Sequence, residues 1–146
     1  LQVEHPVSEL VTGKDIVKWQ IRIAAGVELD CTQDDIKVRG AAIECRINAG
    51  GVGKVDFLHI PSGPWVRFDT FLYQGYEVPP FYDSMLGKMI VFSSTREEAI
   101  RKMQSALCEL VIGGLPNNIE NQIDIIRDPV FQSGDYYTDF IKNREG

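Results

Sequence analysis

A carboxylate near the start of the sequence is the first side chain whose setting suits it to chemistry. Glu4 follows Val3 and precedes His5 and Pro6. Proline biases the residue before it toward extended backbone, so we expect residues 1–6 to be non-helical and His5 to be extended. A carboxylate held on such a segment beside apolar neighbours can act as a base. The alternative, a solvated carboxylate at a frayed terminus, stays open because carboxylates are mostly exposed.

A guanidinium at Arg46 is the second candidate. Residues 36–48 alternate apolar and polar side chains, which is the period of a half-buried strand. The alternation places Arg46 on one face of that strand with Glu44 and Asn48. A guanidinium on a rigid strand is always charged and could stabilise a developing oxyanion. A surface ion pair between Arg46 and Glu44 is the simpler interpretation.

A third group, at residues 81–84, places two aromatic rings, the Asp83 carboxylate and a hydroxyl directly after two prolines. Asp and Ser often cap the start of a strand, so turn chemistry alone explains this group. Residues 50–54 are rich in glycine but lack the Lys-Ser/Thr ending of a phosphate-binding loop, and they predict a flexible turn. The three cysteines are far apart and only two histidines are present, so we predict no metal site and no disulfide framework.

The elements that must position these residues predict an α+β domain. Helical spacing of apolar residues predicts helices at 15–25, 96–111 and 118–127. A capping pair, Thr95 and Glu98, precedes the second of these helices. Strands are expected at 36–48, 54–60, 65–73 and 84–92. We therefore expect a small antiparallel sheet with flanking helices on one side.

Length and composition exclude several classes of protein. The 146 residues suit one domain with a sizeable core. A net charge of −6 with scattered basic residues argues against a nucleic-acid partner. No apolar run approaches the roughly 20 residues of a membrane helix, so we expect no membrane partner. Reduced, structural thiols suit a cytoplasmic setting, which is our default expectation.

Three ordered motifs point to a known family. The motifs are LQVEHPVSE at residues 1–9, ECRINA at 44–49 and YDSMLGK at 82–88. They occur in this order and at similar spacing in biotin carboxylases, and the match continues through 96–111 and DYYT at 135–138. The chain resembles the C-terminal portion of the biotin carboxylase subunit or domain found in acetyl-CoA, pyruvate and propionyl-CoA carboxylases.

The resemblance implies an ATP-dependent ligase that carboxylates biotin on a carrier protein, using bicarbonate and Mg-ATP. In that family Glu4 matches the general base that deprotonates bicarbonate, while Gln2 and the backbone of Val3 match the groups that hold it. Arg46 matches the arginine that stabilises the enolate-like oxygen of biotin. A weak acid needs a positioned base, and an enolate gains most from a fixed cation, so the physical chemistry agrees with these roles.

Further expectations follow from the resemblance alone. Asp83 is expected to orient Arg46, and Arg67 matches a position at the subunit interface of bacterial homodimers. The expected partners are the biotin carboxyl carrier protein, the carboxyltransferase and a second copy of the chain. The expected setting is acetyl-CoA carboxylase in fatty acid biosynthesis.

The sequence also departs from the family pattern. The motif at Leu1 normally follows an Asn-x-Arg segment whose arginine binds bicarbonate, so we expect residues 1–146 to be a fragment lacking the N-terminal and ATP-grasp domains. ATP and Mg would be bound mainly by the missing ATP-grasp domain, and the fragment alone is expected to be inactive. Residues 50–53 replace a longer Pro-rich loop, and Pro64 replaces a Phe at the interface.

Two other functions stay open. A non-catalytic assembly or dimerisation module would keep this fold without needing Glu4. Another ATP-grasp ligase, such as a carbamoyl phosphate synthetase relative, would act without biotin.

Overall fold

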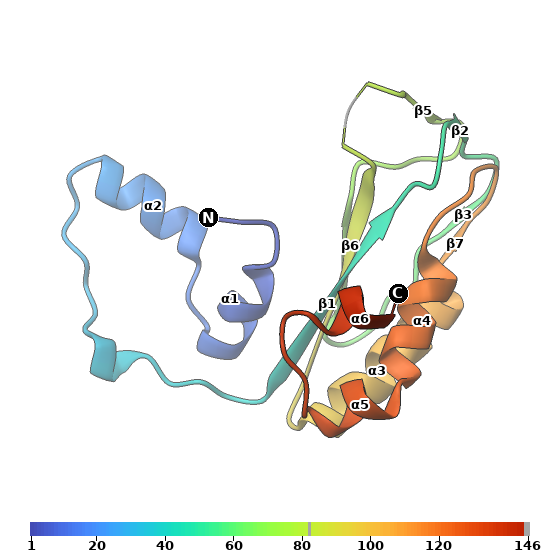
Figure 1. The fold of residues 1–146 in the computed structure, drawn as a ribbon. Helices are drawn as coiled ribbons and strands as arrows, with labels where there is room; N and C mark the ends of the chain where they lie inside the picture. The colour runs from blue at the N-terminus through green and yellow to red at the C-terminus, as the bar shows by residue number, and fades with distance from the viewer. Residues whose placement is uncertain (82, 145–146) are drawn as a thin grey trace.

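A three-stranded antiparallel sheet forms the centre of the computed structural model, which describes residues 1–81 and 83–144 (Figure 1). The strand order is β1-β6-β4. Two short ribbons, β2 with β5 and β3 with β7, extend from one end of this sheet. The strands are β1 (Ala41–Asn48), β2 (Gly53–Lys54), β3 (Leu58–His59), β4 (Val66–Thr70), β5 (Glu77–Val78), β6 (Met85–Ser93) and β7 (Val111–Ile112).

Helices lie on both sides of the sheet. Figure 1 shows α3 and α4 packed together on one side, while α1 and α2 lie on the other side, with α2 projecting away from the body. The helices are α1 (Pro6–Thr12), α2 (Ile16–Ala24), η1 (Gln33–Asp35), α3 (Arg96–Glu109), α4 (Ile119–Arg127), α5 (Pro129–Ser133) and α6 (Phe140–Arg144). The predicted α+β class and antiparallel sheet are confirmed, but the helices are not confined to one side as expected, because α1 packs on the side opposite α3. None of the helices in the described part of the chain is long and apolar enough to cross a membrane.

The main core lies between the sheet and α3. Alternate residues of β1 are buried on this side, and Met103 and Leu107 of α3 pack with them. The side chains of this core that are at most 1% exposed are Ile47, Val55, Leu86, Met89, Val91, Ala99, Met103, Leu107 and Ile126. Burial of Cys45 in this core raises the pKa of its thiol to about 12. The opposite face of β1 is therefore left for Glu44, Arg46 and Asn48, as the alternation predicted.

The beginning of the chain differs from the prediction. His5 adopts right-handed helical backbone (φ −70°, ψ −10°) as the N-cap of α1, so the expected extended geometry is wrong. Proline is well suited to the first position of a helix, where its missing N–H would be unpaired anyway, and this preference outweighs its effect on the residue before it. Residues 1–4 are non-helical, as expected, whereas Pro6, which was also expected to be non-helical, is the first residue of α1.

Other boundaries shift because a strand exists only where it has a partner. β1 begins at Ala41, opposite the last residue of β6, so residues 36–40 have no strand beside them. The predicted strand 54–60 divides into β2 and β3, which pair with two different partners. The flanking helices were predicted correctly in type, and Thr95 accepts a hydrogen bond from the Glu98 N–H as the capping pattern predicted. The helices α1, η1, α5 and α6 and the strands β5 and β7 were not predicted.

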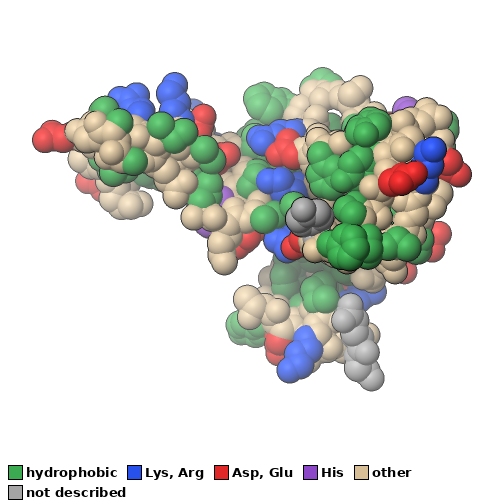
Figure 2. Space-filling model, turned by 90° about the horizontal axis from the view of Figure 1, so that it is seen from above, with side chains coloured by type: hydrophobic (Ala, Val, Ile, Leu, Met, Phe, Trp, Pro, Cys, Tyr) green, Lys and Arg blue, Asp and Glu red, His purple; other side chains and the backbone are tan. Residues whose placement is uncertain are grey.

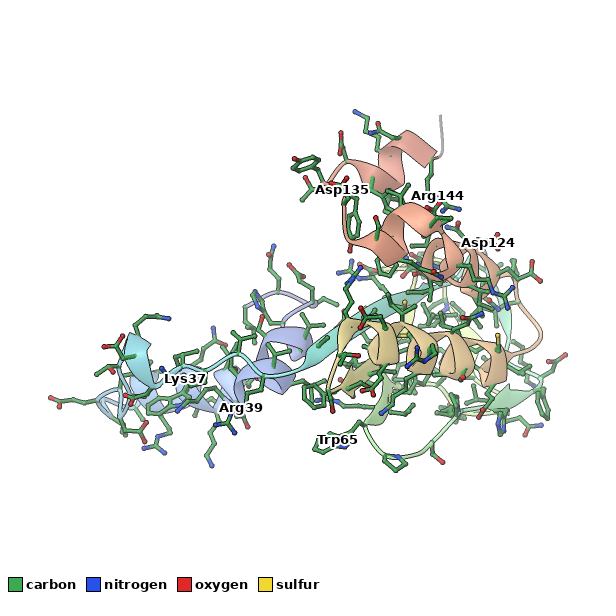
Figure 3. All side chains as sticks on the ribbon, turned by 90° about the horizontal axis from the view of Figure 1, so that it is seen from below. Lys37, Arg39, Trp65, Asp124, Asp135 and Arg144 are labelled. Atoms are coloured by element: carbon green, nitrogen blue, oxygen red, sulfur yellow. The ribbon has the colours of Figure 1, made fainter. Side chains whose placement is uncertain are left out.

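The segment that joins the α2 lobe to the sheet is extended. Lys37 and Arg39 lie on it, between η1 and β1 (Figure 3). The Arg39 N–H donates to the Val11 carbonyl at 2.8 Å, which attaches this segment to α1. α1 itself contacts β1 and β6. The first twelve residues are thereby held against the sheet face that carries Arg46.

Candidate functional site

The sheet face turned away from α3 carries a row of charged residues across its three strands. Lys88 of β6 lies directly opposite Arg46 of β1 and Asp69 of β4 in the strand register. Because residues opposite one another in a sheet point to the same side, these three side chains share one face. The neighbouring row contains Glu44, Ile90 and Arg67. Arg67, predicted as an interface residue, and Arg46 therefore belong to one charged surface.

The N-terminal segment is attached to this surface through Lys88. The Lys88 ammonium donates to the Val3 carbonyl at 3.4 Å and lies 3.7 Å from an Asp69 oxygen. Arg67 in turn donates to both Asp69 oxygens at 2.6 Å through Nε and Nη2. These hydrogen bonds hold the pKa of Asp69 below its usual value, so Asp69 stays ionised beside Lys88.

Glu4 lies near enough to the same surface for its charge to act on Glu44. Burial is the main cause that raises the pKa of the Glu44 carboxyl, and the negative charge of Glu4 raises it further. Lys88 and Arg46 act in the opposite direction. The Lys88–Val3 hydrogen bond and the strand register thus bring the segment of the predicted base beside the strand of the predicted cation, although the two are far apart in the sequence.

The ion pair expected under the simpler interpretation of Arg46 is not formed. Within residues 1–81 and 83–144, no Arg46 nitrogen lies within 4.0 Å of a Glu44 oxygen. Glu44 is half-buried, and its Oε2 atom is buried with no hydrogen-bond partner in the described structure. The Arg46 side chain is exposed. Its guanidinium is therefore available to an anionic partner.

The backbone at Arg46 is fixed by Asn118, a residue that the sequence analysis did not single out. The Asn118 side chain donates to the Arg46 carbonyl at 3.1 Å and accepts from the Asn48 N–H at 2.7 Å. β1 is an edge strand, and the amide group pairs with it much as a neighbouring strand would. Asn118 precedes α4, so the helical layer holds Arg46 in place from behind.

The remaining predicted residues lie at the margins of this surface. Gln2 is exposed, and its carbonyl accepts from the His5 N–H at 3.4 Å. Asp83 is exposed, and it accepts from the Met85 N–H at 2.9 Å, which is the strand-capping role that turn chemistry explains. An Asp83 contact that orients Arg46 stays a prediction. Tyr82, from the same group, lies outside the described residues.

The exposed groups fit an anion held next to a base. Arg46 offers a free guanidinium, and Glu4 offers an exposed carboxylate to the same region. A guanidinium attracts negative charge and a carboxylate accepts a proton, so the two groups suit a reaction in which a proton is removed and negative charge develops. No cluster of three or more His, Cys, Asp or Glu residues suited to a metal ion occurs in the described part of the chain.

Comparison with known proteins identifies the family. The family model described as the biotin carboxylase C-terminal domain matches residues 44–143. The chain belongs to this biotin carboxylase family. A second model, the ATP-binding domain of the carbamoyl-phosphate synthase L chain, matches residues 1–32. The match to the ATP-binding model thus includes α1 and α2, and the match to the biotin carboxylase model includes the sheet from Glu44 onward.

Individual relatives agree with this assignment. The biotin carboxylase of Haemophilus influenzae is 48% identical over 100% of this chain and 34% of its own length, and that of Allochromatium vinosum is 52% identical over 92% and 31%. The crystal structure of the biotin carboxylase domain dimer of Hydrogenobacter thermophilus 2-oxoglutarate carboxylase, with MgADP, ADP and bicarbonate, matches with a TM-score of 0.94 and 40% identity over 99% of this chain and 34% of that one. The chain therefore spans about a third of the length of its relatives.

Proposed function

We propose that this chain is the C-terminal portion of a biotin carboxylase and supplies one wall of the carboxylation site. The observation that carries the proposal is the arrangement of Glu4 and Arg46. Lys88 joins the segment of Glu4 to the charged face of the sheet through the Val3 carbonyl, and the exposed guanidinium of Arg46 belongs to the neighbouring strand of that face. The match of residues 44–143 to the biotin carboxylase model supports the same conclusion.

Each residue of this wall has a role that its chemistry allows. Glu4 accepts the proton of bicarbonate, which turns a poor nucleophile into a better one. Gln2 and the Val3 N–H hold the anion during this transfer. Arg46 stabilises the negative charge that develops on the ureido oxygen of biotin, because a fixed cation acts strongly in a partly dry site. ATP supplies the energy for carboxylation when it is bound by the portion that the relatives carry ahead of the matched residues.

The wider setting follows from the same proposal. Biotin arrives on a carrier protein and leaves for a carboxyltransferase, in acetyl-CoA carboxylase of the cytoplasm, where the product enters fatty acid biosynthesis. Arg67 lies at a homodimer interface, and Asp83 orients Arg46 once biotin is bound.

Reconstitution tests the proposed function. The chain is joined to the first two thirds of the Haemophilus influenzae biotin carboxylase, and ATP hydrolysis that depends on both bicarbonate and free biotin is measured. We expect activity, and we expect Glu4→Gln to lower kcat by about 10²- to 10⁴-fold because the base is lost. Glu28→Gln, at an exposed position in a coil segment, is the control and should leave kcat unchanged. A folded hybrid without activity would contradict the proposal.

A non-catalytic assembly module is the second candidate, and the short glycine loop favours it. Residues 50–53 pack against the loop before α4, where the Gly50 N–H donates to the Pro116 carbonyl at 2.8 Å. An assembly module would be indifferent to Glu4→Gln but would still associate with its partner. Activity that ignores biotin would instead indicate another ATP-grasp ligase.

A further inference from the structure

Lys88 is a largely buried cation at the centre of the candidate site, and the proposed chemistry gives it no task. Its side chain is 19% exposed, compared with 51% for Arg67 on the neighbouring strand. Taking an ammonium group out of water costs free energy unless fixed partners compensate for the lost hydration. The contacts of Lys88 therefore indicate its function.

One contact of Lys88 reaches the backbone next to Glu4. Its Nζ atom donates to the Val3 carbonyl at 3.4 Å, and in the described structure no other hydrogen bond joins the sheet to residues 1–5. The Val3 carbonyl belongs to the planar peptide group that links Val3 to Glu4. Holding this oxygen fixes the plane of the peptide, and with it the position from which the Glu4 side chain leaves the backbone.

The other neighbours of the Lys88 ammonium group lie on the two adjacent strands of the sheet. On one side lies Asp69, at 3.7 Å, which two hydrogen bonds from Arg67 hold in a single orientation. On the other side lies Arg46, its direct partner in the strand register. Lys88 thus joins the segment that carries the base to β6, the strand that is paired with the strand of Arg46.

We propose that Lys88 is a positioning residue for the carboxylation reaction: its ammonium ties the Val3–Glu4 peptide to β6, beside the strand of Arg46, and so sets the separation of base and guanidinium. Asp69 and Arg67 act through Lys88 by holding it in place. A displacement of about 1 Å at a reacting group can cost 10²-fold in rate, so a single tie of this kind affects turnover. The inference rests on the proposed function for its chemical meaning.

Three variants of the hybrid enzyme test this role. Lys88→Met keeps the length of the side chain and removes its charge and donors; it should lower kcat about 10- to 100-fold and leave the KM for ATP unchanged, because nucleotide is bound elsewhere. Lys88→Arg keeps a charged donor and should recover most of the lost activity. Lys142→Met, at an exposed position of α6, is the matched control and should behave as the unchanged protein. Equal loss in Lys88→Met and Lys88→Arg, or a kcat unchanged by Lys88→Met, would overturn the proposal.

A second measurement uses the 146-residue chain itself and does not depend on activity. Backbone ¹⁵N relaxation should show increased motion of the Gln2 and Glu4 amides in Lys88→Met, while amides of α3 remain as rigid as before. Lys88→Arg should restore the order of the N-terminal segment. If an inactive hybrid disproves the proposed function, this measurement still decides whether Lys88 holds the segment. Unchanged order of residues 2–4 in Lys88→Met would show that it does not.

Discussion

Among single residues, Glu44 has the clearest effect on how the stability of the chain depends on pH. Burial raises its pKa, so between the unfolded and folded pKa values the folded state holds more protons than the unfolded state. Stability contributed by Glu44 is therefore greatest at low pH and decreases as the pH rises through this window. The group is half-buried with an unpaired Oε2 atom, so it has no hydrogen bond to offset the loss.

Replacing Glu44 by Gln removes this titration. We expect the free energy of unfolding of Glu44→Gln, relative to the unchanged chain, to increase as the pH rises above about 4, the usual pKa of a glutamate carboxyl group. Urea denaturation at several pH values measures the difference. Glu28→Gln, which changes an exposed carboxylate in a coil segment, is the control for the loss of one negative charge. Parallel stability curves for Glu44→Gln and the unchanged chain would show that burial does not affect this carboxyl group.

Residue types and spacing could suggest Glu4 and Arg46, but not the residues that hold them. Lys88 acts on a carbonyl 85 positions away in the chain, and the Asn118 side chain accepts from an N–H 70 positions away. Local patterns contain no information about such contacts. Lys88 does lie in the YDSMLGK motif, which was a signal of its importance, whereas Asn118 appeared only as the start of a helix.

At the scale of elements, the turn before α4 and the β2 strand approach one another so closely that glycine is required. Gly114 has a φ of +90°, and a methyl group there would collide with the Lys54 carbonyl. Gly114→Ala combines backbone strain with this collision, so we expect it to lower the free energy of unfolding by about 3 kcal/mol or more. Thermal or urea denaturation of the 146-residue chain measures the loss.

Substitutions at two other glycines measure backbone strain and the collision separately. Gly75 also has a positive φ, of +96°, but has open space around it, so Gly75→Ala should cost about 1–2 kcal/mol from strain alone. Gly53 has ordinary backbone, but a methyl group would lie 2.7 Å from the Gly114 carbonyl oxygen, so Gly53→Ala reports on the contact alone. If Gly114→Ala were no worse than Gly75→Ala, the close approach of the two loops would be disproved.

The difference between local patterns and contacts between distant segments explains which elements could be predicted. Amphipathic patterns are local, so α2, α3 and α4 were identified with ends within a few residues. Strand ends depend on partners, so β1 was predicted five residues too long at its start and one predicted strand proved to be β2 and β3. The ribbon of β3 with β7 joins segments more than fifty positions apart, and no local pattern in its two-residue strands could indicate it. The class of fold could be predicted because it requires only the order of the elements.

At the scale of the whole molecule, one apolar side of α2 is exposed and packs against nothing in the described structure. Val17 and Ile21, four positions apart on one side of α2, are 50% and 66% exposed, and no residue of α2 is buried. Figure 2 shows hydrophobic side chains on the surface of the lobe that projects from the body. Residues 1–32, which include α2, match the ATP-binding domain model, and the relatives carry most of their length outside the region matched here. We therefore expect the ATP-binding portion of such a relative to cover this side of α2.

Ile21→Lys tests that expectation. Lys is as good a helix former as Ile and the position is 66% exposed, so the free energy of unfolding of the 146-residue chain should change by no more than about 0.5 kcal/mol. Its affinity for the separately expressed ATP-binding portion should fall about tenfold or more, because a lysine would be buried without a partner in the contact. Val52→Lys, at a 61% exposed position in the glycine loop, is the matched control and should bind as the unchanged chain does. Titration calorimetry measures the affinity of each variant for the ATP-binding portion. Equal affinities of Ile21→Lys and Val52→Lys would mean that this portion does not cover α2.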